Sequence, residues 1–100
     1  MEDSPALKGA DRSKLRGLAM RRRDDATLGK GGIADGFASN VDGLLKREQL
    51  VKVRLLVDDR AERVRLLDEL AVRVGAEVVG RTGKTGLLYR RNLEKPSLLR

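Results

Sequence analysis

The chain has 100 residues, of which 40% are hydrophobic, enough for one domain with one core. It holds no cysteine and no histidine, which excludes disulfide bonds, thiolate metal sites and the commonest general base, so we expect no enzyme and no metal or cofactor. No apolar run approaches the roughly 20 residues of a membrane-spanning helix, and residues 1–5 do not resemble a signal peptide, so we expect a cytoplasmic protein without membrane contact.

Basic side chains are concentrated in two regions of the sequence. Lys and Arg total 22 against 15 Asp and Glu, for a net charge of +7. Residues 7–30 carry eight basic and three acidic side chains and residues 81–100 carry six and one, so each region is near +5. Residues 58–77 carry four and six, a net of −2. This segregation predicts a polyanionic partner if the fold brings the two basic regions together.

The first half of the chain predicts two helices with a short strand between them. After a polar tail over residues 1–6, leucines at helical spacing indicate a helix that ends in basic residues, which favour the helix dipole. Asp24 and Asp25 break it, and a second apolar face at helical spacing follows a run of glycines. The expected elements are a helix over residues 7–20, a strand over 26–28 and a helix over 33–45.

The second half predicts a strand, a helix and a pair of short strands. Apolar side chains alternate with Lys52 and Arg54 over residues 50–57, which is typical of a half-buried strand. Asp58 and Asp59 can start a helix that Gly75 can end. The remaining expected elements are strands over residues 77–80 and 87–90, followed by a loose C-terminal tail over residues 92–100.

The expected order is therefore helix, strand, helix, strand, helix, strand, strand. Strand–helix–strand units favour parallel crossovers and a hairpin adds an antiparallel pair. We expect a single domain over residues 7–91 with an α/β fold: an α+β two-layer sandwich whose mixed four-stranded sheet has helices packed on it.

Gly83-Lys84-Thr85 matches the end of a phosphate-binding P-loop, but the rest of that motif is missing. The motif requires a glycine where Val78 stands, and a helix after the loop, whereas Gly86 to Arg90 is a short apolar run. The pattern favours two strands joined by a Gly-rich turn. A nucleotide-hydrolysing enzyme is a distant alternative, and no small-molecule substrate is expected.

Gly29, Lys30, Gly31 and Gly32 lie between a candidate strand and the start of a helix. Glycines let a nucleic-acid backbone approach closely, a helix start offers unpaired N–H donors, and lysine adds positive charge. A GxxG loop of this kind clamps nucleic acid in KH domains. A flexible turn has the same pattern, so both interpretations stay open at this point.

Nine further basic residues are candidates for the same surface. Singly, each is best explained as a solvated charge at a helix end, sheet face or turn. Together they could form one surface if the fold places them on one side. The chain has only Phe37 and Tyr89 as aromatics, so contacts to backbone and shape are favoured over base stacking. The candidates are Arg21, Arg22, Arg23, Lys52, Arg54, Arg81, Lys84, Arg90 and Arg91.

Four segments occur in a distinctive order and spacing: LKGADRSKLRGLA (7–19), LGKGGI (28–33), EQLVKVRL (48–55) and VVGRTGKTGLLYR (78–90). In these segments the chain resembles the CRM domain (chloroplast RNA splicing and ribosome maturation) in its stand-alone bacterial form, the YhbY-like proteins. The chain departs from the family pattern at two places. Arg22-Arg23-Asp24-Asp25-Ala26 precedes the glycine loop in place of prolines and an apolar strand, which predicts a short or frayed first strand, and Ala34 replaces a threonine near the start of the second helix.

The resemblance implies a fold similar to the C-terminal domain of translation initiation factor three, and RNA binding with the glycine loop as principal contact. It also implies a non-catalytic role in ribosome assembly, on ribosomal RNA or a precursor of the large subunit. The alternative hypothesis is a protein-interaction module that docks on a ribosomal protein or assembly factor, with the basic surface only steering the encounter.

Overall fold

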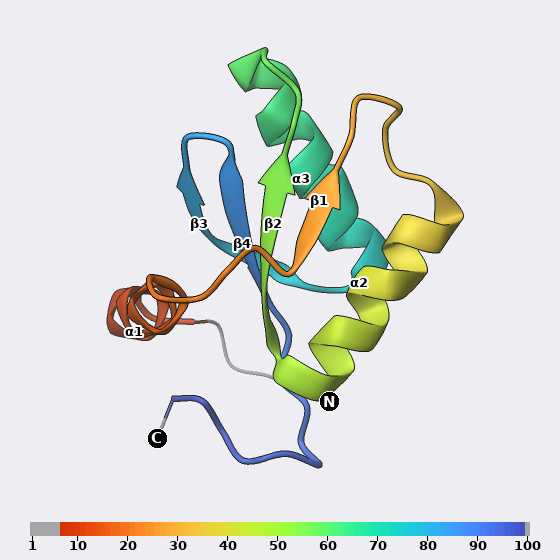
Figure 1. Ribbon diagram of the computed structural model, residues 1–100. Coiled ribbons are helices and arrows are strands. Elements are labelled where there is room, and N and C mark those ends of the chain that lie inside the picture. Colours follow the sequence, from red (N-terminus) through yellow and green to blue (C-terminus); the bar gives the residue numbers. More distant parts are fainter. Residues whose placement is uncertain (1–6, 100) are drawn as a thin grey trace.

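The seven helices and strands follow the predicted order in a computed structural model that describes residues 7–99 (Figure 1). The predicted N-terminal tail over residues 1–6 lies outside the described residues. The elements are α1 (Gly9–Ala19), β1 (Ala26–Leu28), α2 (Asp35–Glu48), β2 (Leu50–Leu55), α3 (Arg60–Val74), β3 (Glu77–Thr82) and β4 (Thr85–Tyr89).

The predicted mixed four-stranded sheet is confirmed, with strand order β1-β2-β4-β3. β1 runs parallel to β2, which fits the crossover through α2. β4 is antiparallel to both β2 and β3, and a register shift lies between Val78 and Gly80 in β3. β2 and β4 are therefore the central strands, with the three-residue β1 at one edge of the sheet and β3 at the other.

Two helices cover one face of the sheet (Figure 1). α2 and α3 bury apolar stripes against the alternate residues of β2 that point to this side, Val51, Val53 and Leu55. Leu67 of α3 and Val41 of α2 are among the fully buried side chains of this core. The sheet with these two helices forms the two principal layers of the fold.

α1 lies against the opposite face and covers only part of it. Leu15 and Ala19 pack on Leu50, Leu87 and Tyr89, which point to this side of the sheet. Burial among these side chains raises the pKa of the Tyr89 phenol. Tyr89 is therefore a core residue. The ends of the strands that lie beyond α1 stay uncovered on this face.

The predicted boundaries of α3 are confirmed by its caps. Asp59 accepts a hydrogen bond from the Glu62 N–H at 2.9 Å, and Gly75 ends the helix in the left-handed region with φ 67°. The chain between β3 and β4 turns at Gly83, with φ 56°. The predicted hairpin is thus confirmed, because Gly83-Lys84-Thr85 leads into a strand and not into a helix.

The C-terminal segment packs on the domain, in contrast to the loose tail that the sequence predicts. The side chain of Gln49, only 2% exposed, donates to the Pro96 carbonyl at 2.9 Å, and Leu98 and Leu99 pack beside α1. A buried amide needs hydrogen-bond partners, and the returning chain supplies them. Within residues 7–99, no helix is long and apolar enough to cross a membrane.

The packing of Gly86 generates a first prediction. A Cβ at this position would lie 3.1 Å from Cγ of the buried Leu67 and closer still to its methyl carbons. We expect Gly86→Ala to lower the free energy of unfolding by about 1–3 kcal/mol through overpacking. The control is Gly43→Ala in the middle of α2, where the only atom of residues 7–99 within 4 Å of a Cβ belongs to the flexible side chain of Arg47. It should raise the free energy of unfolding by about 0.5–1 kcal/mol.

Urea denaturation of the wild type, Gly86→Ala and Gly43→Ala measures both changes in the free energy of unfolding. Equal stability of Gly86→Ala and the wild type would contradict the tight approach of β4 to α3.

Candidate nucleic-acid interface

The glycine loop joins β1 to α2 at one end of the sheet, where the β3–β4 turn and the β2–α3 connection also lie (Figure 1). Gly32 has φ 87°, a conformation that favours glycine. Gly29 and Gly31 have no such φ, and a Cβ on either would meet no atom of residues 7–99 within 4 Å. Backbone conformation therefore explains the glycine at position 32, whereas neither conformation nor packing explains the other two glycines, whose bare backbone is open to an external group.

The start of α2 adds hydrogen-bond donors to this loop. Ala34 stands at the N-cap and provides no side-chain cap, so the first N–H groups of α2 have no partner from that residue. Asp35 in the first turn forms an ion pair with Arg73 of α3, which offsets its negative charge. Unpaired N–H groups and the helix dipole favour an anion at this position.

Lys30 and Lys84 bring positive charge to the same end of the sheet. Lys84 Nζ lies 2.9 Å from Asp58 Oδ1, and Lys30 forms no ion pair within residues 7–99. The pKa of Asp58 is lowered first by the hydrogen bond from Lys84, then by the charges of Lys84 and Lys30. The glycine loop and the hairpin turn, distant in sequence, are therefore close enough to share one electrostatic environment.

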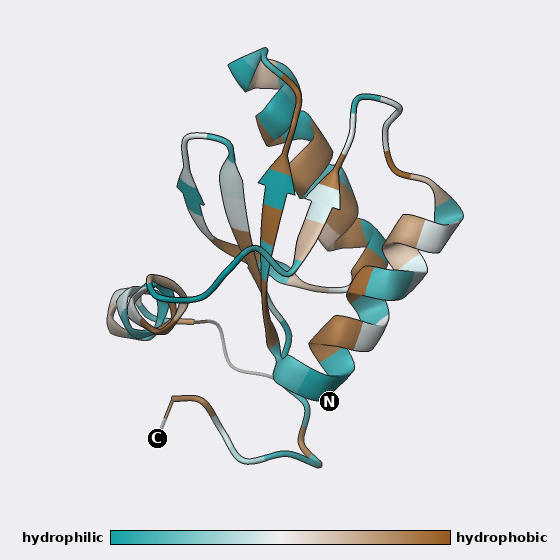
Figure 2. Cartoon of the chain, in the orientation of Figure 1, coloured by the Kyte–Doolittle hydropathy of each residue, from teal (hydrophilic) through white to brown (hydrophobic). Residues whose placement is uncertain are grey.

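The link between α1 and β1 carries three arginines, of which two are available to a partner. Arg21 and Arg23 are exposed and form no ion pair in the described part of the chain. Arg22 instead donates to the Leu50 carbonyl at 3.1 Å and forms a bidentate pair with Asp25 at 2.9 and 3.1 Å. Figure 2 shows this link as a hydrophilic segment that crosses the sheet on the α1 side.

Lys52 and Arg54 lie on the same side of β2 but differ in their availability. The Lys52 ammonium donates to the carbonyls of Ala19 and Arg22 at 3.3 and 3.0 Å, so it holds the end of α1 in place. The Arg54 guanidinium is 49% exposed and makes one long ion pair with Asp24 at 3.8 Å. Arg54 can therefore turn to an external anion at little cost.

Arg90 and Arg91 lie at the other end of the sheet and are occupied internally. Arg90 donates to the Asp42 carboxylate at 2.8 Å and to the Val74 carbonyl at 2.6 Å. Arg91 donates to Gln49 Oε1 at 2.8 Å, where it holds the C-terminal segment. The structure thus separates these two predicted site residues from the glycine loop and gives them structural roles.

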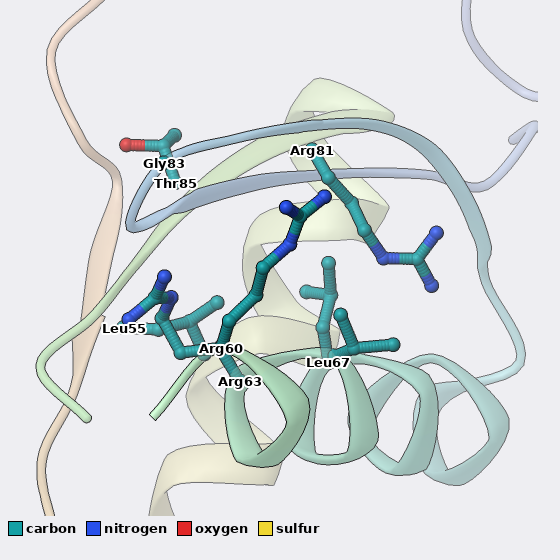
Figure 3. A pocket seen from close by; sticks show the side chains of 8 residues that line it. Leu55, Arg60, Arg63, Leu67, Arg81, Gly83 and Thr85 are labelled. Atoms are coloured by element: carbon teal, nitrogen blue, oxygen red, sulfur yellow. The ribbon is translucent and has the colours of Figure 1, made fainter. Parts of the chain in front are cut away.

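Arg81 is also separated from the α1 side, because it points toward α3 and pairs with Asp68. It lines a pocket of about 250 Å³ between the start of α3 and the β3–β4 hairpin, together with Arg60 and Arg63 (Figure 3). Arg60 and Arg63 are not among the candidates predicted from the sequence, because they belong to the acidic region 58–77. Of these three arginines, Arg81 pairs with Asp68, whereas Arg60 and Arg63 form no ion pair within residues 7–99.

The internal role of Arg90 generates a second prediction. Arg90→Met keeps the aliphatic stem and removes three hydrogen bonds, so we expect unfolding free energy at neutral pH to fall by about 1.5–3 kcal/mol. Arg23→Met, which removes an exposed unpaired charge, should leave it unchanged within about 0.5 kcal/mol. Denaturation curves of both variants check this, and a larger loss for Arg23→Met would contradict the assignment.

The contact between Arg90 and Asp42 also predicts that the stability loss in Arg90→Met depends on pH. The hydrogen bond from Arg90 lowers the pKa of Asp42. A carboxyl whose pKa is lowered by folding contributes stability above its unfolded pKa, about 4, and loses that contribution as pH falls through the folded value. The stability difference between wild type and Arg90→Met should therefore narrow below about pH 4. If the stability difference between the two proteins stays constant from neutral to acid pH, the Asp42 carboxylate does not contribute to the stabilisation by Arg90.

Comparison with known proteins identifies the family of this chain. The chain is 26% identical over 87 residues to a Pseudomonas aeruginosa protein named "Probable RNA-binding protein", an alignment that covers 87% of this chain and 84% of that one. A solution structure of a Staphylococcus aureus protein, described as a candidate RNA-binding protein, superposes with TM-score 0.80 at 27% identity and covers 91% of this chain and 95% of that one. Residues 7–90 match the CRS1 / YhbY (CRM) domain, and the chain therefore belongs to that family.

Proposed function

We propose that this protein is a non-catalytic RNA-binding protein that acts on ribosomal RNA, or on a precursor of the large ribosomal subunit, during ribosome assembly in the cytoplasm. The glycine loop holds the phosphate backbone, and the exposed cations beside it extend the contact. Family membership and the names of the relatives support RNA as the polyanion. The CRM resemblance supports the ribosomal role.

The proposal rests on one observation about Gly29 and Gly31 at the end of the sheet: neither the backbone conformation nor the packing within residues 7–99 requires a glycine at these two positions. Their backbone lies exposed beside the uncapped start of α2 and the unpaired Lys30. Backbone N–H groups, a helix N-terminus and one lysine are together suited to bind a phosphodiester. They supply no nucleophile or general base, so the arrangement binds and does not catalyse.

The proposed contact surface is smaller than the set of basic residues that the sequence suggested. Arg22, Lys52, Arg81, Arg90 and Arg91 satisfy groups within the domain. The cations left for RNA are exposed and lie around the glycine loop, the hairpin turn and the α1 side of the sheet. They are Arg21, Arg23, Lys30, Arg54 and Lys84, of which Arg54 and Lys84 keep exposed ion pairs with Asp24 and Asp58.

The test of the glycine loop is Lys30→Glu with Gly31→Asp, measured by binding to single-stranded RNA. We expect affinity to fall about 10- to 100-fold, because a charge-assisted contact is replaced by repulsion. A matched control is Leu93→Asp with Lys95→Glu, which makes the same change of charge on exposed residues of the C-terminal segment. If control and loop variants lose affinity equally, only net charge matters and the loop is not the clamp.

The number of cations also predicts a salt dependence. Neutralisation of about five phosphates should make log affinity fall with log salt at a slope of about −3.5 for single-stranded RNA. Titrations across a salt series measure this slope, and a salt-independent affinity would contradict the proposed surface. Parallel titrations with large-subunit ribosomal RNA fragments and unrelated RNA test the ribosomal role, which predicts tighter binding of the former.

A protein-interaction module is the second candidate, favoured by exposed apolar side chains on and next to α1. Leu18 is 45% exposed and Met20 79% exposed, on a helix that is otherwise rich in charge. Association with assembly particles that survives nuclease treatment, and that the loop variant does not weaken, would support this candidate over RNA binding.

A further inference from the structure

A row of polar side chains crosses the sheet on the face that α1 covers only in part. Thr27 of β1 pairs with Arg54, Arg54 with Thr85 and Thr85 with Thr82, so the row runs over all four strands. Leu55, next to Arg54 in β2, is buried against α2 and α3. Since successive residues of a strand point to opposite faces, the row lies on the α1 side, beyond the end of that helix.

The row contains every threonine of the chain. Thr27 and Thr82 are exposed and Thr85 is partly buried, and none of the three hydroxyls has a hydrogen-bond partner among residues 7–99. Strand propensity explains threonine in a strand, but not why all three share one row and one face. Each hydroxyl can donate one hydrogen bond and accept two, so the row offers free donors and acceptors to a ligand.

A groove of about 440 Å³ runs beside this row, between α1 and the sheet. Thr82 and Thr85 line it, together with the buried Leu87, the exposed Met20 and the side chain of Arg16. Apolar groups next to free hydroxyls suit a ligand with a flat, partly apolar ring and a hydroxylated sugar. A nucleotide has both.

Charge and position point to RNA as the ligand of this face. Arg54 belongs to the row and is exposed, with one ion pair to Asp24 at 3.8 Å, and the exposed Arg21 and Arg23 lie in the link that crosses the same face of the sheet (Figure 2). Thr27 is separated from the glycine loop by one residue, so a strand held by the loop can continue across the row.

We propose that the threonine row and the groove form a second surface for single-stranded RNA, on which Thr82 and Thr85 bind the ribose 2′-hydroxyl while the base enters the groove. The inference rests on the RNA binding proposed above and adds discrimination of RNA from DNA. RRM domains stack two or three bases on aromatics of a four-stranded sheet. This row has no aromatic side chain, so hydrogen bonds to the sugar replace stacking.

The test is Thr82→Val with Thr85→Val, because valine keeps the shape and strand propensity of threonine and removes only the hydroxyl. Binding is measured to a single-stranded RNA and to the same sequence with deoxyribose and uracil retained. We expect the variant to lose about tenfold in affinity for RNA, with affinity for the deoxyribose strand unchanged. Thr82→Ser with Thr85→Ser should keep the preference, and Ser39→Ala, which removes an exposed hydroxyl on α2, should change neither affinity.

The outcomes separate this inference from the proposed function. A variant that binds both strands as the wild type does, or that weakens for both equally, overturns ribose recognition by the row. A wild type without preference for RNA overturns it as well. In each case, loss of binding in Lys30→Glu with Gly31→Asp would still support the glycine loop as an RNA clamp, whereas failure of the wild type to bind RNA would reject the proposed function itself.

Discussion

The carboxylate of Asp25 fixes the geometry on which the candidate interface depends. It accepts hydrogen bonds from the Lys52 N–H at 2.8 Å and from the Arg22 guanidinium, while the Asp25 N–H donates to the Lys52 carbonyl at 2.7 Å. These bonds attach the chain to β2 just before the three-residue β1 begins. A strand so short contributes few ladder bonds of its own, so Asp25 determines where β1 lies, and through it where the glycine loop leaves the sheet. The same attachment keeps Arg21 and Arg23 at the surface.

Local patterns predicted most of the fold because its elements carry local signals. The alternation in β2, the Asp59 and Gly75 caps of α3 and the short β1 are all recognisable within a few residues of sequence. The packing of the C-terminal segment was not predictable in this way. It depends on Gln49, whose partners lie more than 40 residues further along the chain.

The candidate site was predictable from the sequence only where its residues are contiguous. The glycine loop is contiguous in sequence and was found there, whereas the roles of the arginines depend on distant partners. Arg90 meets Asp42 across 48 positions, and nothing near Arg90 distinguishes it from a solvated arginine. The threonine row requires the register of four strands, because Thr27 and Thr82 are 55 residues apart and meet only through β2 and β4.

The division of the arginines into internally bonded and free ones constrains how the sequence can diverge. At Arg22 and Arg90 a guanidinium binds a carboxylate and a backbone carbonyl at once, a geometry that the single ammonium of lysine does not reproduce. At Arg21 and Arg23 only a positive charge at the surface is required. Among relatives, lysine should therefore often replace arginine at positions 21 and 23 and rarely at positions 22 and 90. The pattern of exchange between arginine and lysine then distinguishes the arginines that stabilise the domain from those that only carry charge.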